Sequence, residues 1–292
     1  MATTTNSTMF TSEQVNDLFS KVKGHSSLAK LCPAMPIPFA GIDVFTFSLD
    51  GEVSIVGEGE NKPAGNATVG TKTIKPIKVV YQHRVTDEFL YMSEEKALPI
   101  LEAFNDGYSK KIARGLDIMA MHGLNPADLT ASATIGNNHF DHITGTAKTS
   151  DPVADIEAAV LRIGDYDMTG IAMSKDFASA LGQYKIDRAY AYPEFRMGAN
   201  PGSINGIPAD VNSTVAKAAA NATADAAILG DFSAFRWGFA ETIPLKVIEY
   251  GDPDGLGDLQ RKNQVVLRAE AYIGWAILDE AAFSRITEQQ GQ

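Results

Sequence analysis

The sequence contains a single cysteine, Cys32, among its 292 residues. One thiol excludes an intrachain disulfide framework and a zinc cluster built from thiolates. Long apolar runs are also absent, since none approaches the roughly 18 residues that a membrane-spanning helix needs. The first eight residues lack the basic and apolar regions of a signal peptide, so we expect synthesis in a cytosol and no membrane partner. With 45% hydrophobic and 21% charged residues, the composition is that of a globular protein with a sizeable core.

Positive charge is scarce, because 25 basic residues stand against 36 acids and give a net charge of −11 with neutral histidines. This balance argues against a protein whose whole surface binds nucleic acid. The basic residues nevertheless gather in two stretches without acids, residues 18–42 and 61–86. Since these stretches carry +8 and the whole chain carries −11, the remaining residues carry −19.

Two basic segments on an acidic body suggest docking onto an acidic surface, which in an acidic homo-oligomer is the neighbouring copy. We therefore predict a subunit interface that includes the basic residues of both stretches and one proline of the second. These residues are Lys21, Lys23, Lys30, Lys62, Pro63, Lys72, Lys75, Lys78 and Arg84.

The N-terminal part predicts a short helix followed by an extended arm. Residues 11–23 begin with a capping box and then place apolar residues at steps of three and four, as in an amphipathic helix. Residues 31–39 contain three prolines, which force an extended and irregular backbone. Such an arm cannot fold on itself and must lie on another surface.

Two strand-like stretches follow the arm and predict a long hairpin. Residues 45–49 alternate apolar and polar side chains, and residues 53–56 continue the first stretch after a turn signal at Asp50 and Gly51. In the second stretch, the odd-numbered residues from 77 to 85 share one face. The 16 residues Gly57–Lys72 between them are almost wholly polar, Gly or Ala, and we expect them to form a loop at the tip of the hairpin.

The longest helical pattern runs over residues 97–122, where apolar residues recur at steps of three or four until Gly123 ends it. At 1.5 Å per residue the helix should be roughly 37 Å long. Pro99 favours a start near Leu98, because proline is best tolerated in the first turn.

After a Gly/Asn/Thr-rich crossover at residues 125–148, the pattern becomes compact α/β. We expect a helix opened by Asp151 and Pro152, a second helix capped by Ser174, and a long half-exposed strand over residues 265–273. The expected buried strands are Ile171–Met173, Ala226–Leu229 and Leu245–Ile248.

Two motifs resemble metal sites, and in both the simpler interpretation is stronger. His139, Asp141 and His142 have ligand chemistry that suits zinc or iron, but their spacing matches no zinc motif and is typical of a solvated turn. Asp252–Asp258 echoes a calcium loop, yet Leu256 and Asn263 stand where ligands belong, which favours a hairpin turn.

The sequence offers no catalytic constellation and implies no cofactor, because nucleophile elbows, phosphate-binding loops and a complete dinucleotide fingerprint are missing. Cys32 lies between apolar residues and prolines and is best explained as a small buried hydrophobe. The aromatic group at residues 232–239 has one basic residue among its members, Arg236, which favours core packing over stacking on nucleic acid.

The order of these elements, together with several short strings, resembles the major capsid protein of tailed bacteriophages, which has the Hong Kong 97 fold. The resemblance runs from about Ser26 to Ile286. The strings that carry it are Asp117–Gly123, Gly206–Pro208, Gly230–Ser233 followed by Trp237 and Gly238, and Arg268–Gly274 with Asp279, Ala282 and Phe283.

The resemblance implies an α+β protein with five segments. These are an N-terminal arm (1–43), an extended hairpin loop (44–86), a peripheral domain with a long spine helix (87–149), an axial α/β domain (150–250) and return strands of the peripheral domain (251–292). It also implies a structural, non-enzymatic protein that assembles into hexamers and pentamers of an icosahedral virion shell around double-stranded DNA. In this family the arm and the extended loop reach over adjacent subunits.

The implied partners are other copies of the chain, a portal, a decoration protein and packaged DNA without sequence-specific contact. Assembly would take place in the host cytoplasm. The chain starts at Met1 without room for the scaffolding segment that some relatives cut off, so we expect a separate scaffolding protein or none. Some relatives crosslink a loop lysine to a neighbour, but no partner for Lys62, Lys72 or Lys75 is evident, and we do not predict the crosslink.

Two alternatives remain open at this point. An encapsulin-like compartment would keep the fold and enclose an enzyme, and the amphipathic helix over residues 11–23 favours it. A soluble α/β metalloenzyme would use His139, Asp141 and His142, but it would leave the two basic stretches unexplained.

Overall fold

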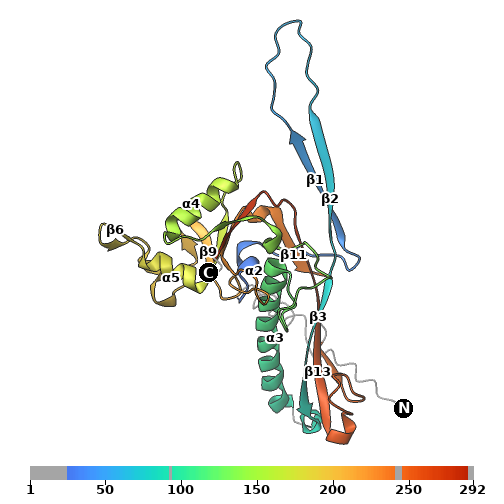
Figure 1. Cartoon of the computed structure of the whole chain (residues 1–292). Helices are drawn as coiled ribbons and strands as arrows, with labels where there is room; N and C mark the ends of the chain where they lie inside the picture. Colours follow the sequence, from blue (N-terminus) through green and yellow to red (C-terminus); the bar gives the residue numbers. More distant parts are fainter. Residues whose placement is uncertain (1–24, 92–93, 241–244, 289–292) are drawn as a thin grey trace.

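The computed structural model of the chain describes residues 25–91, 94–240 and 245–288. Its parts are a projecting hairpin, a four-stranded sheet covered by one long helix, and a six-stranded sheet with shorter helices (Figure 1). The helix expected over residues 11–23 lies outside the described residues. None of the helices in the described part of the chain is long and apolar enough to cross a membrane.

The hairpin consists of β1 (Ile42–Asp50) and β2 (Asn66–Ile74), which pair antiparallel over their whole length. Figure 1 shows it extending away from the rest of the molecule. The expected strand at residues 53–56 is wrong, because those residues belong to the loop between β1 and β2. The expected loop at residues 57–72 is also placed too late, since β2 begins at residue 66. Polar β-branched threonines form much of β2, and their strand propensity is hidden when only apolar residues are counted.

The four-stranded sheet is organised around β13 (Gln264–Ile277). On one edge β13 pairs with β3 (Ile77–Thr86), and on the other it pairs with β11 (Phe235–Phe239) and β12 (Leu245–Ile248). The sequence assigned β3 to the projecting hairpin, and this assignment is wrong because its partner lies about 190 residues later. Strand pairing at such a separation leaves no local pattern in the sequence.

The long helix α3 (Glu94–His122) contains 29 residues, so it is about 44 Å long. It begins three residues earlier than expected, and Pro99 lies inside it. Its end is as predicted, since the Gly123 N–H bonds to the Met119 carbonyl with Gly123 at φ 65°. A short helix that the sequence did not predict, α2 (Ser27–Leu31), packs against α3.

The six-stranded sheet has the order β4-β14-β10-β5-β9-β8 and packs against helices α4 (Pro152–Arg162) and α5 (Lys175–Gln183). Both predicted caps are confirmed: the Asp151 carboxylate accepts from the first turn of α4, and the Ser174 hydroxyl accepts from the Phe177 N–H. The bounds of the strands are β4 (Gly145–Ala147), β14 (Phe283–Thr287), β10 (Asp225–Gly230), β5 (Gly170–Met173), β9 (Ile207–Val211) and β8 (Ser203–Ile204). A separate pair, β6 (Lys185–Ile186) and β7 (Ala189–Tyr190), follows α5.

The larger core fills the space between α3 and the four-stranded sheet, and a second core lies under α4 and α5. Phe232, Phe235 and Trp237 are buried in the larger core, which confirms the packing role expected for the aromatic group. Strand β13 is more buried than its alternation indicates. Its polar face is covered by neighbours: Lys78 of β3, for example, lies 2.9 Å from the carboxylate of Glu270.

Candidate subunit interface

The projecting hairpin carries an apolar face that its own chain does not cover. The register of β1 and β2 places Phe47 opposite Val69 and Phe45 opposite Thr71, so these side chains lie on one face. Phe45, Phe47 and Val69 are 77%, 66% and 67% exposed. Fully burying a side chain of this size is worth about 1.5–3 kcal/mol. A surface that covers this face would therefore add to the stability of the hairpin.

The loop between β1 and β2 extends the same exposed region. Val53 and Ile55 are almost fully exposed, and Lys62 and Pro63 of the predicted interface are exposed as well. A turn near the tip is closed by the Glu60 carboxylate, which accepts from the Gly57 N–H at 3.2 Å. The loop thus combines apolar and basic side chains that its own fold leaves in solvent.

The residues predicted for the interface separate into two groups. Lys30, Lys78 and Arg84 form ion pairs within the chain, with Asp210, Glu270 and Asp254 respectively. Lys62, Pro63, Lys72 and Lys75 are exposed on or beside the hairpin, and Lys72 lies 3.8 Å from Glu280. Lys21 and Lys23 lie outside the described residues. The acidic partners of the first group are 170 to 192 positions away in the sequence, so a count of charges along the chain could not reveal them.

The loop that echoes a calcium site binds a guanidinium group. Arg84 donates to the carboxylates of Asp252 and Asp254 and to the Gly257 carbonyl. Hydrogen bonding to Arg84 lowers the pKa of Asp254 to about 2. The loop is therefore held closed by an arginine of β3, which agrees with its interpretation as a turn rather than a calcium site.

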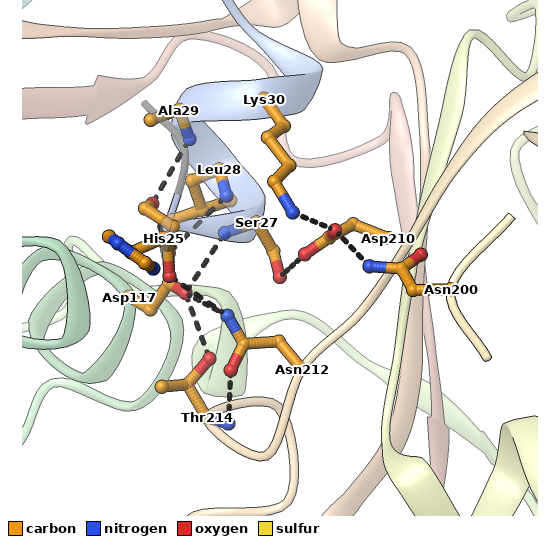
Figure 2. A network of polar contacts seen from close by, with 11 residues as sticks. His25, Ser27, Leu28, Ala29, Lys30, Asp117, Asn200, Asp210, Asn212 and Thr214 are labelled. Atoms are coloured by element: carbon orange, nitrogen blue, oxygen red, sulfur yellow. Dashed lines mark hydrogen bonds and ion pairs between the residues drawn. The ribbon is translucent and has the colours of Figure 1, made fainter. Parts of the chain in front are cut away.

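The start of the N-terminal arm is anchored by a buried carboxylate of α3 (Figure 2). Asp117, fully buried, accepts from the Ser26 hydroxyl at 2.5 Å and from the Ser27 and Leu28 N–H groups at 3.0 and 3.3 Å. The Thr214 hydroxyl at 2.8 Å and the Asn212 amide at 3.3 Å also donate to this carboxylate. Burial raises the pKa of Asp117 to about 6, although these hydrogen bonds act to lower it.

A second carboxylate, Asp210 of β9, holds the other side of α2. It accepts from the Ser27 hydroxyl at 2.6 Å, from the Lys30 ammonium at 2.5 Å and from the Asn200 amide at 2.8 Å. Figure 2 shows the two carboxylates on either side of α2. Together they fix the position of α2 between α3 and β9.

After α2 the arm lies extended along β11, which confirms its expected irregular conformation. The Met35 and Ile37 N–H groups bond to the Trp237 and Phe239 carbonyls at 2.9 and 3.3 Å. Gly238 permits this approach, because a Cβ atom there would lie 1.7 Å from the Met35 carbonyl oxygen. The surface that the proline-rich arm needs is therefore supplied by its own chain.

Cys32 is buried at the start of this segment, as the sequence indicates. Its Sγ atom lies 3.1 Å from the Phe235 carbonyl oxygen, and burial raises the pKa of the thiol to about 11. A thiol in this state is unreactive and packs as a small hydrophobe.

His139, Asp141 and His142, which the sequence favours as a turn over a metal site, do not converge on one point. Asp141 instead contacts His122, at 3.0 Å, and Arg285, at 3.1 Å. His142 lies 3.5 Å from Glu280. These three side chains do not form a metal site, because the turn directs them to different neighbours.

Among the described residues, His122, Asp141 and Asp225 are the group whose atoms lie close enough to hold a metal ion. The Arg285 guanidinium donates to both carboxylates, at 3.1 and 2.8 Å. His122 places one ring nitrogen 3.0 Å from Asp141 and the other 2.9 Å from the Thr214 carbonyl oxygen, so both nitrogens already face protein oxygens. Burial raises the pKa of Asp225, whereas His122 and Arg285 lower the pKa of Asp141 despite its burial. The arrangement is an ion-pair network that joins α3, the crossover and two strands of the six-stranded sheet.

Comparison with known proteins decides the family. A model of the phage capsid family matches residues 9–287. The chain belongs to this family. No curated protein sequence matches the chain.

Solved structures agree with this assignment. A structure from Mycobacterium phage Ogopogo is 31% identical, covers 91% of this chain and 92% of its own, and has a TM-score of 0.78. A structure from Gordonia phage Cozz is 27% identical, with 91% and 87% coverage and a TM-score of 0.73. A capsid of a native GTA particle, 15% identical over 90% of both chains, shares the fold with a TM-score of 0.61.

The resemblance and the α+β fold of the Hong Kong 97 type are thus confirmed. The protein is a structural capsid protein, its place is the capsid of the virion, and its partners are copies of itself in a shell. Such a protein acts through its surfaces. The apolar face of Phe45, Phe47 and Val69 is the part of this surface that the sequence did not identify. The alternation of apolar and polar residues was visible in the sequence. No local signal says whether such an apolar face packs on the core of its own chain or on another chain.

Proposed function

We propose that this capsid protein assembles into the hexamers and pentamers of an icosahedral shell that encloses double-stranded DNA. The observation that carries the proposal is the exposed apolar face of the hairpin, made by Phe45, Phe47 and Val69 on strands that project from the body (Figure 1). An apolar face of this kind on a projecting element marks an interaction surface. The protein that can cover it in a shell is an adjacent copy of the same chain.

Charge supports the same arrangement. Lys62, Lys72 and Lys75 lie on or beside the hairpin, and the body of the chain is acidic. Basic side chains on the hairpin therefore favour a neighbour's body over another hairpin. Lys30, Lys78 and Arg84 serve a different purpose in this proposal, because their ion pairs hold the arm, β3 and the 251–258 loop in place. Pro63 at the loop, and Lys21 and Lys23 of the arm, complete the proposed contact surface.

The proposal includes assembly in the host cytoplasm and the segment division 1–43, 44–86, 87–149, 150–250 and 251–292, corrected where strands pair across it. Strands β3, β11 and β12 pair with β13 and belong with the peripheral segment, whereas β4 and β14 belong to the six-stranded sheet of the axial segment. The further partners are a separate scaffolding protein, a portal, a decoration protein and DNA held without sequence-specific contact. The net charge of −11 favours such loose contact, because an acidic shell does not adhere to the anionic DNA backbone.

Light scattering and negative-stain microscopy of the expressed full chain test the proposal. We expect closed shells or hexameric and pentameric rings, and we expect Phe45→Ser combined with Phe47→Ser to leave a folded monomer. Because both phenylalanines are exposed, their loss should not affect folding, which circular dichroism checks. Thr46→Ser, on the opposite face of β1, is the control and should assemble normally. A double variant that assembles as well as the unchanged chain contradicts the proposal, as does an unchanged chain that stays monomeric when it is expressed together with the other proteins of its own virion.

The cargo separates a virion shell from an encapsulin-like compartment. Particles isolated from the natural host cells should protect DNA from nuclease. Particles that enclose an enzyme and no DNA would support the compartment instead and would contradict the enclosure of DNA.

A further inference from the structure

A groove runs along one edge of β3, between this strand, α3 and the loop that follows α3. Its volume is about 710 Å³, which lies in the range of pockets that bind ligands. Every residue of β3 from 77 to 81 lines it. Since successive side chains of a strand point to opposite faces, a cavity that touches such an unbroken run follows the edge of the strand. In the described part of the chain β13 is the one strand that pairs with β3, so this edge has no strand partner there.

The edge of β3 is suited to accept a further strand. β3 spans 10 residues and pairs with β13 without a register shift, so it is regular over its whole length. Every second residue of such a strand turns its N–H and C=O groups away from its partner. Val80 and Tyr81 are 48% and 39% exposed beside these groups. A long, regular edge with exposed apolar side chains is a template for pairing with another chain.

The wall of the groove opposite β3 is cationic. Lys111 and Arg114 of α3 line it, and neither forms an ion pair with any residue that the structure describes. Lys78 of β3 lines it too and pairs with Glu270 at 2.9 Å. The lining residues, all of which lie in the described part of the chain, include no acid. Two cations of the groove are therefore free to bind a carboxylate.

Acids that neighbour this wall in the sequence have other partners. Asp106 of α3 forms an ion pair with Lys110 at 2.8 Å. Asp128, in the loop after α3, accepts from the Thr130 N–H at 3.0 Å and from its hydroxyl at 2.8 Å. Each of these carboxylates is thus satisfied locally, and the positive charge of the groove remains.

A tyrosine of the groove wall also lacks a partner. Tyr108 of α3 lines the groove, and its buried hydroxyl makes no hydrogen bond to any described residue. Most buried polar groups in folded proteins are hydrogen-bonded. A donor left without an acceptor at this wall favours an occupant that supplies oxygen acceptors.

We propose that the groove binds an extended segment of a different protein, in which acidic and apolar side chains alternate, as an added strand on β3. The carboxylates of the segment reach Lys111 and Arg114, and its apolar side chains cover the exposed Val80. In this mode of recognition the main-chain hydrogen bonds supply affinity and the alternate side chains supply specificity. The proposal does not depend on the assembly proposed above, because a single chain contains the whole groove.

The N-terminal arm of the chain does not fit this groove. Asp117, which binds Ser26, lies about 200° around α3 from Gly115 and Met119 of the groove wall. The arm therefore starts on the opposite side of the helix. Residues 1–24 also contain as many lysines as acids, so they offer the cations of the groove no net negative charge.

The hairpin loop of a second copy is the other candidate from this chain. It carries Glu52, Glu58 and Glu60 beside exposed apolar residues. However, the loop folds back on itself, since the Glu60 N–H bonds to the Gly57 carbonyl at 3.2 Å and the Glu60 carboxylate closes the same turn. An edge that accepts a single extended strand therefore suits a separate segment better.

Fluorescence anisotropy with the full chain tests the groove. The probe is a fluorescein-labelled peptide of alternating glutamate and valine, 10 residues long to match β3. We expect saturable binding that Lys111→Gln combined with Arg114→Gln weakens at least tenfold. Lys110→Gln is the matched control, because Lys110 is an exposed neighbour on α3 outside the groove lining, and its affinity should match that of the unchanged chain. Absence of binding, or an equal loss in the control and the double variant, overturns the proposal.

N-methylated peptides test whether the segment binds as a strand. One peptide is methylated on the backbone nitrogens of its valines and a second on those of its glutamates, which leaves the charge unchanged. Because alternate N–H groups of a strand face its neighbour, one of the two should bind at least tenfold more weakly than the parent peptide. Two methylated peptides that bind as well as the parent contradict strand addition to β3.

Cysteine labelling locates the bound peptide, since Cys32 is the single native thiol and is buried. Ala127→Cys places a thiol at an exposed position of the groove lining, and saturating peptide should slow its labelling at least tenfold. Ser54→Cys, in the exposed hairpin loop, is the control and should label at the same rate with and without peptide. Protection of both thiols in the absence of peptide would place the loop of a second copy in the groove and contradict a separate partner. Assembly without peptide binding contradicts this proposal alone and leaves the proposed function intact.

Discussion

Ser26 and Asp117 are 91 residues apart in the sequence, yet the Ser26 hydroxyl donates a 2.5 Å hydrogen bond to the Asp117 carboxylate. Ser26 is also the N-cap of α2, where its oxygen accepts from the Ala29 N–H at 3.1 Å. The carboxylate accepts from the next two backbone N–H groups as well. A side chain of the long helix thus accepts from the first N–H groups of α2, which Ser26 does not bond, and adds to the local cap. The start of α2 is therefore tied to the long helix α3.

Replacing this carboxylate by its amide should loosen the arm. Asp117→Asn keeps the shape but turns an NH₂ group toward hydroxyl and N–H donors, which leaves buried groups without acceptors. We expect a loss of about 2–4 kcal/mol in the free energy of unfolding, measured by urea denaturation. Asp176→Asn, at an exposed position of α5, is the control and should change stability by less than about 0.5 kcal/mol. Equal midpoints for the two variants would show that the carboxylate does not hold the arm.

The same residue predicts how stability depends on pH. Burial raises the pKa of Asp117 to about 6, above the ordinary value of 3.8, so the native state binds its proton more tightly than the unfolded state does. Between these two values the native state carries more protons, and its stability therefore falls as pH rises. The part of the free energy of unfolding that the protonated Asp117 carboxyl contributes amounts to about 3 kcal/mol. It is lost by about pH 6.

The measurement is the difference in urea midpoint between the unchanged chain and Asp117→Asn at several pH values from 4 to 7. The difference isolates Asp117 from carboxylates with lowered pKa values, such as Asp254, whose effect has the opposite sign. A difference that is the same at pH 4 and pH 7 would contradict the raised pKa.

Two glycines should respond in opposite directions to the same substitution. Gly238→Ala places a Cβ atom 1.7 Å from the Met35 carbonyl oxygen, so the arm must move away from β11. We expect destabilisation of more than about 3 kcal/mol. Gly107→Ala, at an exposed position of α3 with no atom near its Cβ, should stabilise the chain by up to about 1 kcal/mol. The midpoints of thermal unfolding compare the two variants. An unchanged midpoint for Gly238→Ala would mean that the arm does not lie on β11.

Elements with local signals could be predicted from the sequence. The caps of α4 and α5, at Asp151 and Ser174, depend on residues within three positions and were identified correctly. The end of α3 at Gly123 is equally local, because one glycine supplies the left-handed conformation. Periodicity also located α3 and β13, which are long enough for the pattern to be unambiguous.

Contacts between distant residues could not be predicted in this way. The sequence contains the bases Lys30, Lys78 and Arg84 and their acids, but only the fold shows which pairs meet. The partners of Asp141 were hidden for the same reason, since His122 and Arg285 come from other elements. The exposure of the hairpin's apolar face could not be identified either. A strand that projects from its own chain shows the same alternation of apolar and polar residues as a strand that covers a core.

The buried thiol provides a probe for the release of the arm. Cys32 is the single cysteine of the chain, it is buried, and its pKa is raised to about 11. At pH 8 the raised pKa alone lowers the thiolate fraction roughly 200-fold relative to a free cysteine, and burial slows access further. Labelling of the folded chain by a disulfide reagent should therefore be slower than labelling in urea by at least this factor. Both Asp117→Asn and Gly238→Ala should accelerate it, because each lifts the segment that covers Cys32, whereas Gly107→Ala should not. Fast labelling of the unchanged folded chain would place the thiol at the surface and contradict the docking of the arm on β11.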